Sequence, residues 1–142
     1  MRISPLRVLV CDDSPTYAAG LRRLVEHGRD LEVVAVHGSA ESAIAALPHV
    51  RPDLVTMDVE LPGMNGIDAV ETIMRLHPVP ILVVSSRARR GSDTVAAAYA
   101  AGAAAAIAKD DLELSNPDGI AAAALRRRVR MLASQEPLQE SC

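Results

Sequence analysis

Five short apolar runs alternate along the chain with segments of helical pattern, and this alternation restricts the fold more than any other feature. The runs are rich in Val, Ile, Leu or Ala and lack polar alternation, as expected for strands buried on both faces. The predicted strands are residues 6–11, 31–37, 53–57, 80–84 and 103–108. Because short connections with one helix each join them, the pattern predicts a parallel sheet with right-handed crossovers and helices on both faces.

Capping residues, prolines and glycines indicate where the helices begin and end. A serine before a helical pattern is a typical N-cap, proline is favoured at the first helical position, and glycine often follows the last turn. Pro48 to Pro52 is expected to be a loop. The predicted helices run from Pro15 to a stop at Gly28, from Ser39 to about Leu47, from Ile67 to Leu76, from Ser92 to Gly102 and from Asn116-Pro117 to about Ala133.

Composition argues for one domain and against several classes of function. The chain has 142 residues, of which 49% are apolar, and residues 1–134 are expected to form the domain, with 135–142 as a flexible C-terminal tail. A pI near 5.8 and an aromatic content of 1% argue against a nucleic-acid partner. No apolar run reaches membrane-spanning length and no secretory pattern opens the sequence, so a cytoplasmic protein without membrane contact is expected.

Polar side chains follow four of the five predicted strands. Asp12-Asp13 follow the first strand, Asp58 the third, Ser85 the fourth and Lys109 the fifth. Ligands of open α/β sheets bind beyond the carboxyl ends of the strands, so these side chains are expected to converge at one edge. Lys109 is the only lysine of the chain, a compact charge where arginine is used elsewhere.

The residue types at this edge suit phosphoryl chemistry. Three carboxylates repel one another, and a hard dication with oxygen ligands relieves that repulsion; Mg²⁺ is favoured because it accepts one or two carboxylates plus waters. The hydroxyl of Ser85 and the ammonium of Lys109 suit the oxygens of a phosphoryl group. Asp58, on the middle strand, is then the predicted nucleophile that becomes an aspartyl phosphate.

Taken together, these motifs resemble the receiver domains of bacterial two-component response regulators. The resemblance rests on Asp12-Asp13, residues 57–66, Ser85 and Lys109, in family order, and covers the chain from about residue 6 to 133. It is greatest to the receiver of chemotaxis protein-glutamate methylesterases, through residues 84–86 and the long segment 110–116. The resemblance implies a flavodoxin-like (βα)5 fold, a doubly wound parallel five-stranded sheet of order 2-1-3-4-5.

The family also implies a role for each site residue. Mg²⁺ would be bound by Asp13, Asp58 and the backbone carbonyl of Glu60, with Asp12 acting through water. Ser85 and Lys109 would contact the phosphoryl oxygens. A histidine kinase would donate the phosphoryl group, and an output protein that the sequence does not identify would read the signal from a monomer or weak dimer.

At two positions the sequence departs from the family pattern. Asp110 follows Lys109, where the family usually carries proline, often with a cis bond. Ala106 stands three residues before Lys109, where a tyrosine or phenylalanine usually acts as a switch ring. Without that ring, the expected output routes are the backbone of the loop after Ser85 or the side chain of Tyr99 from the preceding helix.

The resemblance predicts a phosphorylation-activated switch in chemotaxis-like signal transduction, whose only catalysis is its own Mg²⁺-dependent phosphorylation and dephosphorylation. One alternative is the regulatory half of a protein-glutamate methylesterase. Another is a small phosphatase, because Asp58-Val59-Glu60 also resembles the start of a haloacid-dehalogenase-type Mg²⁺ site, although such enzymes usually carry a second Asp where Glu60 stands. The receiver family's geometry also implies that Glu60 and Arg87 face each other across the mouth of the site.

Overall fold

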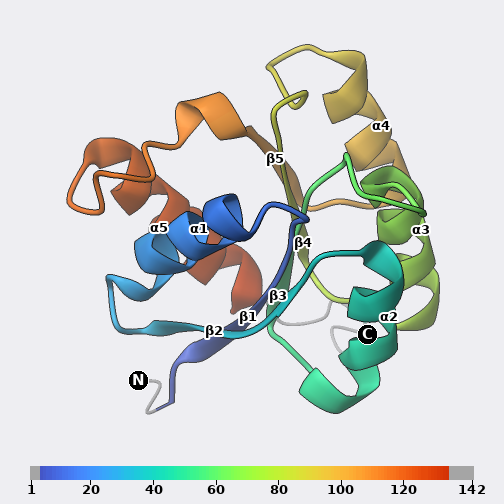
Figure 1. The fold of residues 1–142 in the computed structure, drawn as a ribbon, viewed down its shortest axis with the longest axis horizontal. Helices are drawn as coiled ribbons and strands as arrows, with labels where there is room; N and C mark the ends of the chain where they lie inside the picture. Colours follow the sequence, from blue (N-terminus) through green and yellow to red (C-terminus); the bar gives the residue numbers. More distant parts are fainter. Residues whose placement is uncertain (1–3, 135–142) are drawn as a thin grey trace, which may run out of the picture.

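A parallel sheet of five strands lies between two layers of helices (Figure 1) in the computed structural model, which describes residues 4–134. The strands are β1 (Leu6–Cys11), β2 (Leu31–His37), β3 (Leu54–Met57), β4 (Ile81–Ser85) and β5 (Ala105–Ala108). The helices are α1 (Pro15–Glu26), α2 (Ala40–Val50), α3 (Gly66–Leu76), α4 (Asp93–Ala101) and α5 (Ile120–Ala133), with a 3-10 turn, η1 (Lys109–Asp111). The strand order β2-β1-β3-β4-β5 confirms the predicted flavodoxin-like fold.

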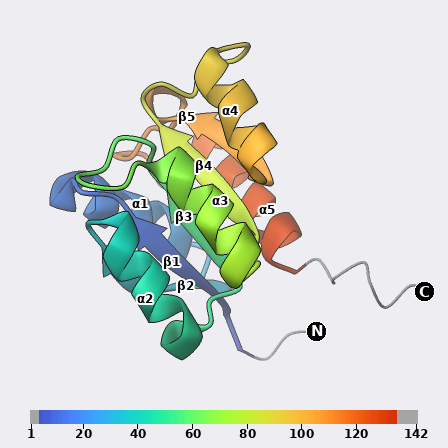
Figure 2. The ribbon, with the colours of Figure 1, turned by 90° about the vertical axis from the view of Figure 1, so that its right-hand side faces the viewer.

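Alternate residues of the central strands face opposite layers of helices. In β1, Val8 and Val10 belong to a core with α1 and α5, whereas Leu9 and Cys11 belong to a core with α2, α3 and α4. Figure 2 shows this second layer in front of the sheet. Every residue of β3 and β4 is buried, because side chains on both faces are covered. The predicted strands lack polar alternation for this reason.

Two helix boundaries differ from those predicted by more than two residues. Pro48 was expected to begin a loop, but α2 continues through it to Val50. In the last turn, proline removes only one helical hydrogen bond, while the same turn buries Leu47 and is closed by a hydrogen bond of 2.9 Å from the Arg51 amide to the Leu47 carbonyl. The helix therefore tolerates the proline.

The last helix begins at Ile120 rather than at Asn116-Pro117. Residues 116–119 form a turn, in which the amide of Gly119 donates to the Asn116 carbonyl at 3.0 Å. The Pro117 carbonyl accepts a hydrogen bond of 3.1 Å from the guanidinium of Arg126, which also donates to the Leu24 carbonyl. That guanidinium fixes the turn against α1, so the helix starts after it.

The fifth strand was predicted for residues 103–108 and is observed as Ala105–Ala108. Ala103 instead follows Gly102, the C-cap of α4, and its amide donates to the Ala98 carbonyl at 3.0 Å, which closes that helix end. Among residues 4–134, no helix has the length and apolar content needed to cross a membrane. The tail predicted for 135–142 lies outside the described residues, and the domain limit at 134 stays a prediction.

Candidate functional site

The carboxyl ends of β1, β3, β4 and β5 bring the predicted site residues to one edge of the sheet. Cys11 pairs with Met57 across β1 and β3, so Asp12 and Asp58 leave the sheet side by side. Ser85 pairs with Ala108, which directly precedes Lys109. Carboxylate oxygens of Asp12, Asp13 and Asp58 lie within 4.8 Å of one another. The convergence expected from the sheet topology is therefore present.

The ammonium of Lys109 bridges two buried carboxylates. Its Nζ lies 2.7 Å from Oδ2 of Asp12 and 3.2 Å from Oδ2 of Asp58. Each aspartate is only 5% exposed, and the side chain of Lys109 is 16% exposed. Burial disfavours the charged amine, but the hydrogen bond to Asp12 and the charge of Asp58 outweigh it and raise the pKa of Lys109. The lysine is therefore a fixed positive charge in the site.

The carboxyl of Asp58 is held in a less favourable environment than an exposed aspartate. Burial raises the pKa of Asp58, and the neighbouring charge of Asp12 acts in the same direction. Lys109 lowers it, as does the Glu60 amide, which donates to Oδ1 of Asp58 at 3.3 Å, yet these contacts do not offset the burial. The ionised form of Asp58 thus destabilises the fold.

Asp58→Asn is therefore expected to raise the melting temperature at pH 7 by a few degrees. A folded-state pKa above the unfolded value means that stability falls as the pH rises from the unfolded pKa, near 3.8, through the folded one. Wild type carries the whole penalty at neutral pH, and the gain from the substitution should disappear toward pH 3.8. Thermal melts across this range test it, with Asp111→Asn, an exposed aspartate beyond Lys109, as control. A gain that is independent of pH would contradict the assignment.

Backbone geometry fixes the two buried carboxylates. Oδ1 of Asp12 accepts a hydrogen bond of 2.8 Å from the amide of Ser14, the N-cap of α1. The loop of residues 59–65 returns to the end of β3 before α3 begins, and the Gly66 amide donates to the Val59 carbonyl at 2.8 Å. A Cβ at position 66 would collide with the Asp58 carbonyl, so only glycine lets α3 start this close to β3.

Two loops meet beside Asp58 through the pair that the sequence predicted. Nε of Arg87 lies 2.9 Å from Oε2 of Glu60, and the Ser86 hydroxyl donates to Oε1 of Glu60 at 3.4 Å. Ser85 is fully buried, and its Oγ accepts a hydrogen bond of 3.2 Å from the Arg87 amide. The Glu60 carboxylate contacts Arg87 and Ser86 and is not part of the cluster of Asp12, Asp13 and Asp58, and a role of its backbone carbonyl in metal binding stays a prediction.

The structure shows which residues surround Asp110 and Ala106, the two positions that depart from the family pattern. Lys109 and Asp110 lie in η1, and the Asp110 carboxylate pairs with Arg89 at 3.3 Å. None of the peptide bonds described for residues 4–134 is cis. Ala106 and the half-exposed Tyr99 line one pocket of about 360 Å³ at α4 and β5. Tyr99 thus lies beside the position where the family carries its ring, and its part in output stays a prediction.

One contact in the site was not predicted from the sequence. The centroid of the Tyr17 ring lies 4.2 Å from Nζ of Lys109. Tyr17 is in the first turn of α1, where its amide donates to the capping Ser14 hydroxyl at 3.1 Å. Two tyrosines are the only aromatic residues of the chain, and the position of one of them just after Asp12-Asp13 was the available signal.

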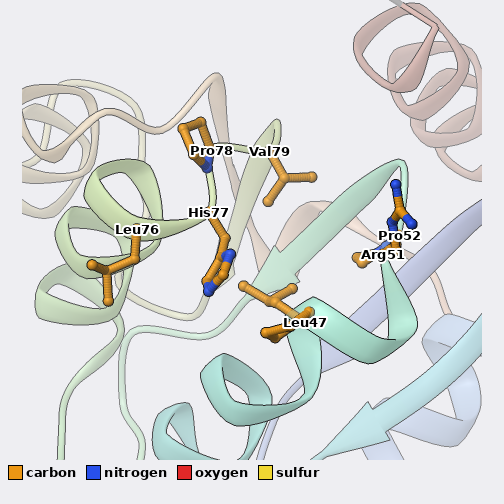
Figure 3. Close-up of a pocket in the computed structure, with 8 residues that line it drawn as sticks. Leu47, Arg51, Pro52, Leu76, His77, Pro78 and Val79 are labelled. Atoms are coloured by element: carbon orange, nitrogen blue, oxygen red, sulfur yellow. The ribbon is translucent and has the colours of Figure 1, made fainter.

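A separate pocket of about 430 Å³ lies at the opposite, amino-terminal edge of the sheet. Figure 3 shows that its walls come from the ends of α2 and α3 and from the loops that follow them. Leu47, Leu76, Val79 and three prolines make it largely apolar, and none of the described residues that line it carries a carboxylate. The carboxylates and the ammonium that suit phosphoryl chemistry lie instead at the carboxyl edge.

Comparison with known proteins agrees with this geometry. The profile of the response regulator receiver domain matches residues 8–124. A protein-glutamate methylesterase/protein-glutamine glutaminase of Agrobacterium fabrum is 45% identical over 97 residues, which are 68% of this chain and 28% of the relative. One from Chromohalobacter salexigens is 34% identical over 99% of this chain and 42% of the relative. The chain thus spans less than half of the length of these relatives.

Solved structures of response regulators share this fold. The response regulator domain of Thermotoga maritima CheB superposes with a TM-score of 0.84 at 30% identity, covering 94% of this chain and 99% of that one. A two-component response regulator of the LuxR family from Aurantimonas gives a TM-score of 0.75 at 29% identity, covering 94% and 89%.

Proposed function

Because this chain belongs to the response regulator receiver domain family, we propose that it is a switch in which Asp58 accepts a phosphoryl group from a histidine kinase. The observation that carries the proposal is the contact of one ammonium, that of Lys109, with the buried carboxylates of both Asp12 and Asp58. It puts a nucleophile next to a fixed positive charge at the sheet edge where α/β proteins bind ligands.

The acidic cluster suits a magnesium ion. Asp12, Asp13 and Asp58 offer hard oxygen ligands within 4.8 Å of one another, and Asp13 is exposed, so the cluster is open to solvent. We assign Asp13, Asp58 and the Glu60 carbonyl as ligands, with Asp12 acting through water. When bound, Mg²⁺ would neutralise negative charge on the carboxylates and on the phosphoryl group.

The transfer itself needs little from the protein beyond position and charge. A carboxylate oxygen of Asp58 attacks phosphorus, and the phosphorus–nitrogen bond of the donor phosphohistidine breaks. The bonding electrons stay with the imidazole, which takes up a proton from solvent. The Lys109 ammonium and the Ser85 hydroxyl donate hydrogen bonds to oxygens of the transferred group, where negative charge is greatest.

Incubation with acetyl phosphate and Mg²⁺ tests the proposal without knowledge of the kinase. The intact mass of wild type is expected to increase by one phosphoryl group, and chelation of Mg²⁺ should prevent the increase. Turnover of a small phosphate ester distinguishes a switch from a phosphatase, and we expect none. Absence of any mass increase, under conditions that label another receiver domain, would contradict the proposal.

The methylesterase relatives suggest the pathway in which this receiver acts. Their matched segments cover only 28% and 42% of the two relatives, so a larger part of each lies outside the receiver. We infer that this receiver serves a chemotaxis-like pathway in the cytoplasm, either alone or as the regulatory half of a methylesterase. The reading frame around codons 1–142 discriminates, since a methylesterase domain in frame supports the second alternative and a stop codon supports the first.

The Glu60–Arg87 pair leads to a prediction about the lifetime of the phosphorylated form. Hydrolysis needs a water in line with the bond between Asp58 and phosphorus, and two long side chains that bridge the neighbouring loops obstruct that approach. An exposed ion pair is worth about 1 kcal/mol at most, so replacing both residues with Ala should speed phosphate loss by no more than about fivefold. Dephosphorylation rates of the single and double variants measure the effect.

Arg89→Ala is the matched control, because Arg89 is an exposed arginine of the same loop whose partner is Asp110. It should leave the rate of phosphate loss unchanged. A double variant that keeps its phosphate as long as wild type would show that the ion pair does not restrict access of water.

A further inference from the structure

The Tyr17 ring is the one neighbour of the Lys109 ammonium, among the contacts described for residues 4–134, that is neither acidic nor used in the proposed transfer. Nζ lies 4.2 Å from the ring centroid, within the range of a cation–π contact. The same Nζ lies 2.7 Å from Oδ2 of Asp12 and 3.2 Å from Oδ2 of Asp58. The ammonium is therefore held between an aromatic face and two carboxylates.

The position of the ring is itself well determined. Tyr17 is in the first turn of α1, whose capping Ser14 is tied to Oδ1 of Asp12. The ring packs against the core formed by α1, α5 and the sheet. Asp12 and Tyr17 are thus parts of one short rigid segment, and this segment presents both groups to the ammonium.

The hydroxyl of Tyr17 does not account for the position of this side chain beside the site. It is buried, and no hydrogen-bond partner for it is found among residues 4–134. Burial, with the charges of Asp12 and Asp58, raises the pKa of Tyr17, so the side chain stays a neutral phenol. The part of Tyr17 that contacts the site is the ring.

We propose that Tyr17 is a positioning residue whose ring holds the ammonium of Lys109 beside Asp58, ready to contact an incoming phosphoryl oxygen. This inference rests on the proposed function. The carboxylates also attract the ammonium, but they share their charge with a metal ion and a phosphoryl group during transfer. The ring is a partner that the reaction does not alter, so it keeps the flexible lysine in place throughout.

Tyr17→Leu is expected to slow phosphorylation by acetyl phosphate about tenfold, because a desolvated cation–π contact is lost. Tyr17→Phe keeps the ring and should react at the wild-type rate. Affinity for Mg²⁺ should be the same in all three, since Asp12, Asp13 and Asp58 are unchanged. Met131→Leu, which changes an exposed apolar side chain in the last turns of α5, is the control and should also react normally.

The single lysine allows the contact to be observed directly. In protein labelled with ¹³C at lysine only, the ε-methylene gives one NMR signal, which belongs to Lys109. The ring current of Tyr17 should shift its protons upfield in wild type and in Tyr17→Phe, and the shift should be lost in Tyr17→Leu. This measurement needs no phosphoryl donor, so it remains informative if wild type is never phosphorylated, a result that would count against the proposed function instead.

Two outcomes would overturn the inference. A Tyr17→Leu variant that loses the upfield shift and is still phosphorylated at the wild-type rate would show that the ring does not assist the transfer. A Tyr17→Phe variant as slow as Tyr17→Leu would assign the effect to the hydroxyl. Melting curves of both variants separate these results from a loss of folding.

Discussion

Asp58→Asn is expected to abolish the mass increase that wild type shows with acetyl phosphate and Mg²⁺. The amide that replaces the carboxylate carries no negative charge, so it is too weak a nucleophile to attack phosphorus. Loss of folding is not the expected cause, because the raised pKa of Asp58 predicts a variant at least as stable as wild type at pH 7. Intact-protein mass spectrometry measures the label.

Asp111→Asn is the matched control for this experiment. It makes the same chemical change at an exposed aspartate in η1, next to the site but outside the carboxylate cluster. It should be labelled as fully as wild type. Equal labelling of Asp58→Asn and wild type would exclude Asp58 as the acceptor.

Asp13→Ala and Lys109→Ala are expected to impair different properties: the first Mg²⁺ binding, the second the conformational change on phosphorylation. Asp13 is the exposed member of the carboxylate cluster, and its loss removes a charged oxygen that we propose as a Mg²⁺ ligand. Even partners outside the ligand sphere alter metal affinity about 10- to 100-fold, so affinity for Mg²⁺ should fall by about 100-fold or more. Calorimetric titration is the suitable measurement, because the chain has no tryptophan to report binding.

Lys109→Ala leaves all three carboxylates and removes the cation that contacts Asp12 and Asp58. It should therefore retain Mg²⁺ affinity but lose the conformational change that phosphorylation causes, which amide NMR spectra with and without phosphoryl donor detect. Arg89→Ala, which removes an exposed positive charge nearby, should respond as wild type does. A Lys109→Ala variant that still changes conformation would show that the lysine is not the contact that signals phosphorylation.

Much of the fold followed from the sequence because parallel strands buried on both faces leave a plain apolar signal. The fifth strand shows where that signal is weak: its alanine-rich residues favour a helix, and only the alternation of elements indicated a strand. The predicted start of α5 was wrong because Arg126 fixes Pro117 in a turn before the helix. This tertiary contact cannot be inferred from local helix propensity.

The site was predictable to the extent that sheet topology determines it. Residues that end neighbouring strands must converge, so Asp12, Asp58, Ser85 and Lys109 could be grouped without coordinates. The cation–π contact could not be predicted in this way. It depends on the tertiary contact between the first turn of α1 and η1, which brings Tyr17 to a lysine far away along the chain.

Locating the phosphoryl group tests directly whether Asp58 is the acceptor. Reduction of the phosphorylated protein with borohydride converts an aspartyl phosphate to homoserine, which peptide mass spectrometry assigns to one position. Homoserine is expected at position 58, with unmodified aspartate at positions 12 and 13. Homoserine at either of those two positions, or a phosphate that resists reduction on Ser85, would contradict it.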